Sequence, residues 1–387
     1  MTDTADKGLL PAGLQDVLAP LAAHESQVLE RLVAAFRAQG YDRVKPPLLE
    51  FEEALLTGPG AALAGQTFRL MDPVSQRMMG LRADMTPQVA RIAATRLKNT
   101  PRPLRLCYGG QVLQVRGSQL RPERQFAQAG AELIGAAEEA ADAEVVLLAI
   151  EALDAVGVAG LSVDLNLPPL VGSLAADLGL GEAQVRDLRM ALDRKDAAAV
   201  TALAGAQAEL FHALLRSAGP AESALAALKA LDLPPAAAQE VRRLDAVLSL
   251  IQAAAPEARV TVDPVEHRGF EYQTGISFIL FAKGVRGELG RGGRYQAAGP
   301  NAAQEPSTGF TLFMDTVLRA VPGPQHQRRI YLPFGTAVAK ARDLRREGWE
   351  TLAGLSQAEQ AEDEARRLGC SHVLRGDAAV ALEPAND

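Results

Sequence analysis

Hydrophobic and polar positions follow two different periods along the first 168 residues. Apolar side chains recur at helical spacing over 20–38, and Gly40 follows as a helix stop. The next segment, 41–50, contains Pro46 and Pro47, which exclude a helix interior and favour an edge or interface strand. The same periodicities predict a hairpin over 67–81, a helix from about Pro87, a hairpin followed by a third strand over 104–135, a helix over 145–158 and a strand over 161–167.

The pattern changes over 170–255, where the sequence is rich in Ala and Leu, repeatedly helical and almost free of β-branched runs. This composition predicts an all-helical insertion of five or six helices. Strand character returns over 259–282 and 290–296, and 308–320 reads as a strand followed by a helix. The chain is therefore predicted to have an α+β fold, in which an antiparallel sheet is flanked by helices and interrupted by a helical block.

The last part of the chain alternates between strand and helix signals. Residues 328–387 read as strand, helix, strand, helix and strand, an order that implies a small parallel sheet. The changes of pattern predict four regions, which are the first part of the core at 1–168, the helical insertion at 169–256, the second part of the core at 257–325 and a small α/β domain at 326–387.

Composition and charge narrow the classes of function. The formal net charge is −7 without a basic run, which argues against nucleic-acid binding. Cys107 and Cys370 are isolated and fit a reducing cytoplasm, and the five histidines show no metal-ligand spacing. Because a signal peptide and an 18-residue apolar run are both missing, the chain is predicted to be cytoplasmic and not membrane-spanning. No cofactor is predicted.

The segment 104–135 resembles the second signature motif of class II aminoacyl-tRNA synthetases, most closely that of histidyl-tRNA synthetase. The family's Phe-x-Gln-x-x-x-Glu run is present here as Phe126, Gln128 and Glu132. The family's Arg-x-Glu tripeptide, which grips ATP, is replaced by Gln114 and Arg116. By this resemblance, the motif keeps the residues that bind the amino acid in the family and lacks the pair that binds ATP.

Further segments carry the same resemblance. Pro47 matches the hallmark proline of the first class II motif, which implies a homodimer interface formed by 41–50 and the preceding helix. LRADMT at 81–86 resembles the family's LRPEGT, HRGFEYQTG at 267–275 its histidine-specific RGLDYY, and GRGGRYQ at 290–296 its GGRYD strand. In HRGFEYQTG, Gln273 replaces the second tyrosine of the family's RGLDYY. In the third class II motif, 308–320, Thr316 stands where the family has its catalytic arginine.

The resemblance implies a class II synthetase-like antiparallel sheet with a truncated anticodon-binding-like domain at the C-terminus. It also implies a histidine pocket, because the residues at the family's binding positions offer carboxylates, a cation, polar acceptors and aromatic walls. The implied histidine-binding residues are Asp84, Thr86, Gln128, Glu132, Arg268, Tyr272 and Tyr295. The degenerate ATP positions are Gln114, Arg116 and Thr316.

The lost arginines bear directly on catalysis. Amino-acid activation builds negative charge at the α-phosphate, and removing one preorganised donor costs about 3–4 kcal/mol of transition-state stabilisation. The combination is similar to the synthetase-like regulatory subunits of ATP phosphoribosyltransferase. That family implies no catalytic residues and no tRNA. It also implies a short catalytic subunit as partner, a homodimer within a hetero-octamer, and feedback control of histidine biosynthesis by L-histidine.

Other interpretations remain open at this stage. The chain could be a histidine–tRNA ligase, or an enzyme that adenylates another small molecule, with relocated arginines. Arg116 is predicted to share a strand face with Gln114, and Arg319 follows Thr316 by one helical turn. It could also be a dimeric scaffold without a ligand. In that case Asp84 or Thr86 only caps a helix, and Gln128, Glu132, Arg268 and Tyr295 form a satisfied polar network around an empty cleft.

Overall fold

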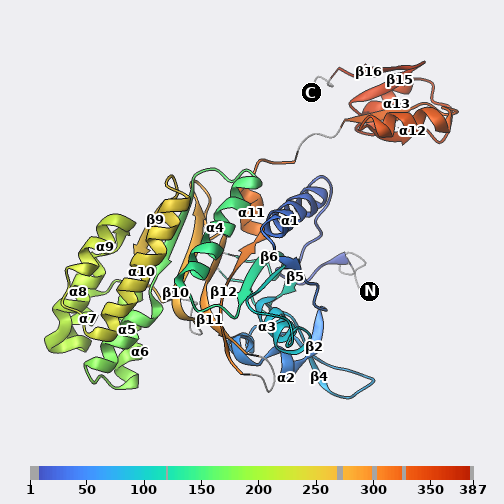
Figure 1. The fold of residues 1–387 in the computed structure, drawn as a ribbon. Helices are drawn as coiled ribbons and strands as arrows, with labels where there is room; N and C mark the ends of the chain where they lie inside the picture. Colours follow the sequence, from blue (N-terminus) through green and yellow to red (C-terminus); the bar gives the residue numbers. More distant parts are fainter. Residues whose placement is uncertain (1–7, 119–120, 268–272, 299–302, 325–327, 384–387) are drawn as a thin grey trace, which may run out of the picture. The chain divides into compact units, whose positions relative to one another are not determined.

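The computed structural model describes residues 8–118, 121–267, 273–298, 303–324 and 328–383. It separates into two compact units, Met1–Gly323 and Pro324–Asp387. The first unit carries all the candidate site residues of the synthetase-like motifs. Figure 1 shows its central sheet with the helical insertion at one end.

Counting the described residues, nine strands form the large sheet of the first unit, in the spatial order β1-β5-β6-β12-β11-β10-β7-β9-β8. The pairings are antiparallel, except that β1 runs parallel to β5 and β7 parallel to β9. The strands are β1 (Asp42–Arg43), β5 (Leu104–Leu113), β6 (Gln125–Ile134), β12 (Glu305–Phe313), β11 (Gly290–Ala297), β10 (Gln273–Ala282), β7 (Leu161–Asn166), β9 (Arg259–Asp263) and β8 (Gly219–Pro220).

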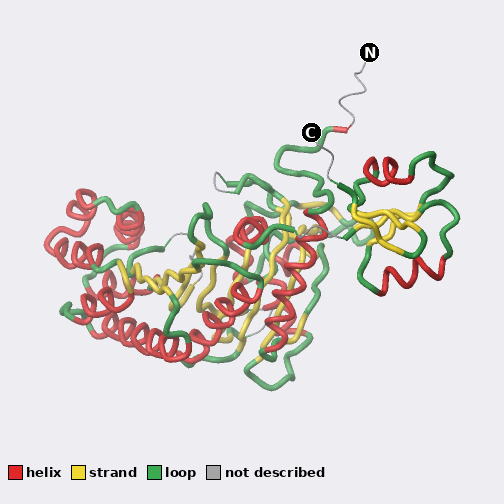
Figure 2. The backbone as a smooth tube through the Cα atoms, turned by 90° about the horizontal axis from the view of Figure 1, so that it is seen from above, coloured by secondary structure: helices red, strands yellow, loops and turns green. Residues whose placement is uncertain are grey.

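Helices α1 (Leu21–Ala38) and α4 (Glu139–Ala155) pack on one face of this sheet, next to α10 (Pro235–Ala254) (Figures 1 and 2). The prediction of a helix over 20–38 is confirmed. Its apolar stripe ends in Phe36, whose ring meets Phe310 of β12 edge to face with centroids 5.4 Å apart. Helix α4 begins six residues before the predicted helix over 145–158, and most of its length is buried. Burial of this face provides the main hydrophobic core.

The opposite face of the sheet carries α3 (Thr86–Thr95) and a second apolar cluster. Successive side chains of a strand point to opposite faces, so Cys107 of β5 belongs to the main core, whereas Leu106 and Tyr108 face α3. Beside α3 lies a small antiparallel sheet in the order β2-β4-β3. Its strands are β2 (Leu49–Phe51), β3 (Arg69–Met71) and β4 (Met78–Leu81). The helices α2 (Glu52–Leu55) and η2 (Gly58–Leu63) lie between β2 and β3 in the chain.

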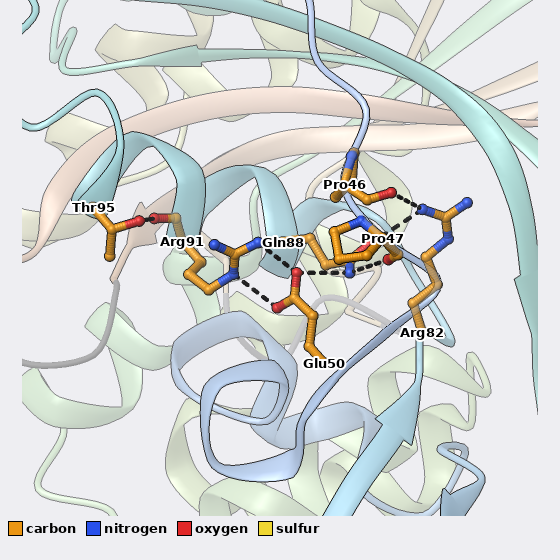
Figure 3. A network of polar contacts seen from close by, with 7 residues as sticks. All are labelled: Pro46, Pro47, Glu50, Arg82, Gln88, Arg91 and Thr95. Carbon is orange, nitrogen blue, oxygen red and sulfur yellow. Dashed lines mark hydrogen bonds and ion pairs between the residues drawn. The ribbon is translucent and has the colours of Figure 1, made fainter. Parts of the chain in front are cut away.

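A polar network holds the extended segment between β1 and β2 (Figure 3). Buried Arg82 donates to the carbonyl oxygen of Pro46 at 3.0 Å and to that of Gln111 at 2.7 Å. Gln88 of α3 donates to the carbonyl oxygen of Pro47 at 2.8 Å and to Glu50 at 2.9 Å. Glu50 in turn pairs with Arg91, so the proline segment is tied to α3, which carries part of the candidate site.

The predicted insertion is confirmed as a run of helices between β7 and β9, but it is not all-helical, because the two-residue strand β8 lies within it and pairs with β9. Where the chain is described, it comprises α5 (Pro168–Asp177), α6 (Glu182–Asp193), α7 (Ala197–Ala204), η3 (Gly205–Gln207), α8 (Ala208–Arg216), α9 (Ala221–Lys229) and α10. By length and composition, Ala197–Arg216 resembles a membrane span, with a mean hydropathy of 1.3. Gly205, at φ 53°, breaks it into α7 and α8. Each half is far shorter than the roughly 20 residues that a span needs.

Two expectations need correction. The third strand predicted within 104–135 is wrong, because this stretch contains only the β5–β6 hairpin among its described residues. The described parts of its connection, 114–118 and 121–124, carry glycine, proline and charged residues that do not pair as a strand. The predicted parallel pairing of the three C-terminal strands is confirmed, but the small sheet also has a fourth strand, β16 (Ala378–Ala381), which was not predicted and is antiparallel.

The second unit has a sheet in the order β14-β13-β15-β16. β13 pairs in parallel with β14 and β15, and β16 is antiparallel to β15. Trp349 and Leu344 close one side of this sheet. The elements are β13 (Arg329–Leu332), α12 (Val338–Arg346), β14 (Glu350–Ala353), α13 (Ala361–Arg367), β15 (His372–Arg375) and β16 (Ala378–Ala381).

Candidate functional site

Glu132 lies near the C-terminal end of β6, on the face that α3 covers, with 1% of its surface exposed. Its Oε2 accepts a hydrogen bond from the Tyr295 hydroxyl of β11 at 2.8 Å. Its Oε1 accepts from the Thr86 hydroxyl at 2.9 Å and from the Tyr108 hydroxyl at 3.3 Å. Three hydroxyl donors from three different elements therefore surround one buried carboxyl.

Burial raises the pKa of the Glu132 carboxyl to about 8, because the charged form loses its hydration. The charge of nearby Asp84 acts in the same direction, while the bonds from Tyr295 and Thr86 favour the charged form. The same low-dielectric environment raises the pKa of Tyr108 well above its usual value. A cationic group that entered this space would stabilise the ionised form of Glu132.

Asp84 and Gln128 form the second part of the site. The Gln128 side chain is fully buried, and its Nε2 donates to Asp84 Oδ2 at 3.0 Å. The Met85 N–H donates to Gln128 Oε1 at 3.3 Å, and the Thr86 N–H donates to Asp84 Oδ1 at 2.8 Å. The Asp84 carboxylate is therefore held at the start of α3, whereas the Thr86 hydroxyl turns away from the helix toward Glu132.

A cavity of about 60 Å³ adjoins Glu132 and opens to the same region as a larger cleft of about 290 Å³. Asp84, Thr86, Arg291 and Phe313 line both spaces. The smaller cavity is also lined by Glu132, Gln273, Gly292, Gly293, Tyr295, Gly309, Phe310 and Thr311. The larger one reaches Gln128 and the loop after β5.

Two glycines leave the space that the Glu132 carboxyl and the neighbouring Tyr108 hydroxyl occupy. An added Cβ at Gly309 of β12 would overlap Oε2 of Glu132, and one at Gly130 of β6 would overlap the Tyr108 hydroxyl. Both positions lie on strands that are hydrogen-bonded on each side, so the backbone has little freedom to move away. The site therefore depends on two small residues that the synthetase-like motifs do not single out.

Five of the seven predicted histidine-binding residues are brought together here: Asp84, Thr86, Gln128, Glu132 and Tyr295. Arg268 and Tyr272 lie outside the described residues. Sequence reasoning missed Tyr108 and Thr311, whose hydroxyls are 2.8 Å apart beside Glu132. The alternation of β5 could have pointed to Tyr108, because it shares a face with Leu106, the register partner of Glu132.

The degenerate ATP positions lie in and around the larger cleft. Gln114 and Arg116 both line it, but they follow the end of β5, so the predicted shared strand face is wrong. Gln114 donates to the carbonyl oxygen of Ala83 at 3.3 Å. Thr316 is buried in α11 (Met314–Ala320) and accepts a hydrogen bond from Arg319 at 3.1 Å.

Two further arginines line the larger cleft, and each has a carboxylate partner. Arg121 donates to Asp315 at 3.0 Å, and its guanidinium lies 3.8 Å from the ring centroid of Phe313. Arg291 pairs with Glu288. The sequence motifs pointed to neither residue. Their charges are therefore partly balanced by these carboxylates. Within the described part of the chain, no group of His, Cys, Asp or Glu could hold a metal ion.

Comparison with known proteins agrees with this geometry. The family model described as histidyl-tRNA synthetase matches residues 13–317. A relative from Rhodospirillum centenum, named ATP phosphoribosyltransferase regulatory subunit, is 58% identical over 379 residues. The alignment covers 97% of this chain and 97% of that relative.

Two solved structures are similar in fold. An ATP phosphoribosyltransferase regulatory subunit/histidyl-tRNA synthetase from Bacillus halodurans C matches with a TM-score of 0.80 at 23% identity, covering 93% of this chain and 96% of that one. A chain of the ATP phosphoribosyl transferase complex from Thermotoga maritima matches with a TM-score of 0.59 at 18% identity, covering 75% and 97%. The predicted α+β fold of the class II synthetase type is confirmed. Taken with the 58% identity over nearly its whole length, the family match shows that this chain belongs to the histidyl-tRNA synthetase family and, within it, to the ATP phosphoribosyltransferase regulatory subunits.

Proposed function

We propose that this chain senses L-histidine in the Glu132 cavity and regulates a short catalytic subunit of ATP phosphoribosyltransferase, without catalysing a reaction itself. The observation that carries the proposal is the buried carboxyl of Glu132 beside a small cavity, with the Asp84 carboxylate at its entrance. The name of the 58% identical relative supports the regulatory role.

The two carboxyl groups suit the two ends of histidine. The small cavity has a volume of about 60 Å³, and its wall offers Glu132, Tyr295 and Thr311 to ring N–H groups. Asp84 lies where both spaces meet, within reach of an α-ammonium group. Arg268 and Tyr272, outside the described residues, remain proposed contacts that rest on the family resemblance, with Arg268 facing the ligand carboxylate.

Amino-acid activation is proposed to be lost. Gln114 and Thr316 are neutral, and Arg319 contacts Thr316 instead of lining the larger cleft. Arg121 and Arg291 are engaged by Asp315 and Glu288. The assay is histidine-dependent exchange of pyrophosphate into ATP. We expect no exchange above background, and a rate like that of a true synthetase would favour the alternative of an active ligase.

Regulation requires that histidine binds one assembly state better than another, because a ligand shifts an equilibrium only by its differential affinity. We propose that the assembly is a hetero-octamer that contains homodimers of this chain. When the purified chain is mixed with the short catalytic subunit of the same organism, phosphoribosyl transfer should rise. It should then fall as histidine is added.

The Glu132→Gln variant tests histidine sensing separately from activation of the catalytic subunit. This variant should still activate the catalytic subunit, because Glu132 is buried inside the first unit, but inhibition should need more histidine. Losing a charged hydrogen-bond partner costs roughly 1.5–3 kcal/mol, or about one to two decades of affinity. Equal activity of the catalytic subunit with and without this chain would contradict the regulatory role. Unchanged histidine affinity in Glu132→Gln would place the histidine site elsewhere.

A further inference from the structure

A groove of about 540 Å³ lies on the first unit and shares no lining residue with the cavity beside Glu132. We call it the α4–α10 groove, because it is lined by the end of α4, the connection from α10 to β9 and the start of β7. Its apolar floor includes Ile150, Val158, Leu161 and Val163. The two valines are buried in the main core, and Ile150 and Leu161 pack against that core while staying partly exposed. The main core therefore reaches the surface at this groove.

The topology of the sheet brings two helix ends to this groove. Helix α4 leads into β7 and α10 leads into β9, and these two strands run parallel to each other. The two helices pack side by side (Figure 1), so both carboxyl ends emerge at the edge of the sheet where β7 and β9 begin. The carboxyl end of a helix carries partial negative charge, and neither helix has a basic residue in its own last turn. Arg31 of α1 balances part of this charge at the end of α4, where it donates to the carbonyl oxygen of Ala155.

Carboxylates add to the negative charge at the rim of the groove. Glu151 and Asp154 lie one turn apart on α4, and Glu257 lies in the connection from α10 to β9. Asp154 and Glu257 are exposed and form no ion pair within the described part of the chain, and Glu151 accepts a hydrogen bond from the Gln39 amide at 2.6 Å. Among the described lining residues, Arg259 at the start of β9 is the only cation. Three carboxylates against one guanidinium, together with the helix ends, make the rim negative.

An apolar floor with a negative rim fits a protein segment that carries an apolar side chain next to Lys or Arg. Small-molecule sites fix the orientation of their ligand with a few precisely placed polar groups inside the pocket. The α4–α10 groove lacks such groups, because none of the buried polar side-chain atoms that have no partner in the described structure belongs to a residue that lines it. Its charged groups lie at the rim instead, where charge complementarity with a protein partner sets specificity and association rate.

We propose that the α4–α10 groove docks a basic segment of the short catalytic subunit, which places an apolar side chain between the ends of α4 and α10. This inference rests on the proposed regulatory function and assigns a surface to it. Helix α4 packs against α1 on one flank and α10 on the other (Figure 1). The expected homodimer uses α1 and 41–50, on the flank away from α10. It therefore leaves the groove open for a different protein.

Charge reversal at the rim tests this docking. The Asp154→Lys/Glu257→Lys variant is titrated into the short catalytic subunit of the same organism, and phosphoribosyl transfer is measured at low and at high salt. We expect the concentration of this chain that gives half-maximal activation to rise at least about tenfold at low salt, because like charges would face each other. The difference from wild type should shrink at high salt, since salt screens exposed charges. An unchanged half-activating concentration at low salt would overturn the inference.

Two further variants separate the local effect from overall charge and from apolar contact. Asp187→Lys/Asp232→Lys makes the same change in net charge at two exposed carboxylates of the helical insertion, outside the groove. This control should activate like wild type at both salt concentrations, and weakening equal to that of the rim variant would overturn the inference. Ile150→Thr should raise the half-activating concentration about three- to tenfold at both salt concentrations, because salt does not screen apolar contacts. Activation by Ile150→Thr like that of wild type would exclude the apolar contact.

The same titrations distinguish the failure of this inference from the failure of the proposed function. If the wild-type chain does not activate the catalytic subunit, the regulatory function fails and the docking surface fails with it. If wild type and the rim variant activate equally well, only the docking surface is wrong. At saturating concentration the rim variant should be inhibited by the same histidine concentration as wild type, because Asp154 and Glu257 line no part of the Glu132 cavity. A changed sedimentation of the rim variant by itself would assign the groove to a second copy of this chain and overturn the inference.

Discussion

At the scale of single residues, the buried carboxyl of Glu132 links the stability of the protein to pH. Its folded-state pKa of about 8 exceeds the ordinary value near 4.5, so between these values the folded chain binds more protons than the unfolded chain. The free energy of unfolding should therefore fall as pH rises through this range, by up to about 1.4 kcal/mol per pH unit. Urea unfolding of wild type and Glu132→Gln between pH 5 and 8 measures it. Parallel pH profiles would contradict the assignment.

Gly309 offers a second test at this scale. A Cβ in Gly309→Ala would overlap the Glu132 carboxyl, and β6 and β11 hold the strand on both sides. We expect the variant to lose about 1–3 kcal/mol of stability through overpacking and to bind histidine at least about tenfold more weakly. Gly323→Ala is the control, because an added Cβ there meets no atom within 4 Å. Equal histidine binding by both variants would show that Glu132 can move without consequence.

At the scale of elements, Arg82 ties the segment between β1 and β2 to the β5 strand. Arg82→Met would leave the carbonyl oxygens of Pro46 and Gln111 without these donors. Because unsatisfied buried acceptors are costly, we expect a loss of about 2–4 kcal/mol in urea unfolding. Lys229→Met is the control, since Lys229 forms an exposed ion pair with Asp245 that should contribute at most about 1 kcal/mol. Similar losses for both variants would argue that the network does not stabilise this segment.

At the scale of the whole molecule, the proline segment also bears on assembly. Pro47 is exposed on the single chain, and the neighbouring Leu48 is 54% exposed, although the backbone of Pro47 is held by Gln88. We expect a homodimer through 41–50 and α1. Pro47→Asp should raise its dissociation constant about a hundredfold or more, because an unpaired charge would be buried at the contact.

Sedimentation equilibrium measures this dimer. Val338→Asp, at an exposed position of the second unit, is the control and should leave the dissociation constant unchanged. A monomeric wild-type chain would rule out the homodimer, and a Pro47→Asp variant as tight as wild type would move the contact away from 41–50.

The sequence by itself determined the parts of this protein that depend on local order. The helical period of 20–38, the Ala- and Leu-rich insertion and the strand signals around it predicted the α+β fold, because periodicity reports which face of an element is buried. The motifs also identified Asp84, Thr86, Gln128, Glu132 and Tyr295, which the fold brings together. The third strand predicted in 104–135 was wrong, because the described part of the loop after β5 is rich in glycine, proline and charged residues and pairs with no strand.

Only the tertiary structure decided how these residues act on one another. The pairing of Arg121 with Asp315 joins positions 194 residues apart, and Tyr108 meets Thr311 across 203 residues. No local pattern reports such contacts. The raised pKa of Glu132 likewise comes from its burial among strands and α3. Charge, hydration and hydrogen bonding depend on which atoms surround a group, and that environment exists only once distant segments have packed together.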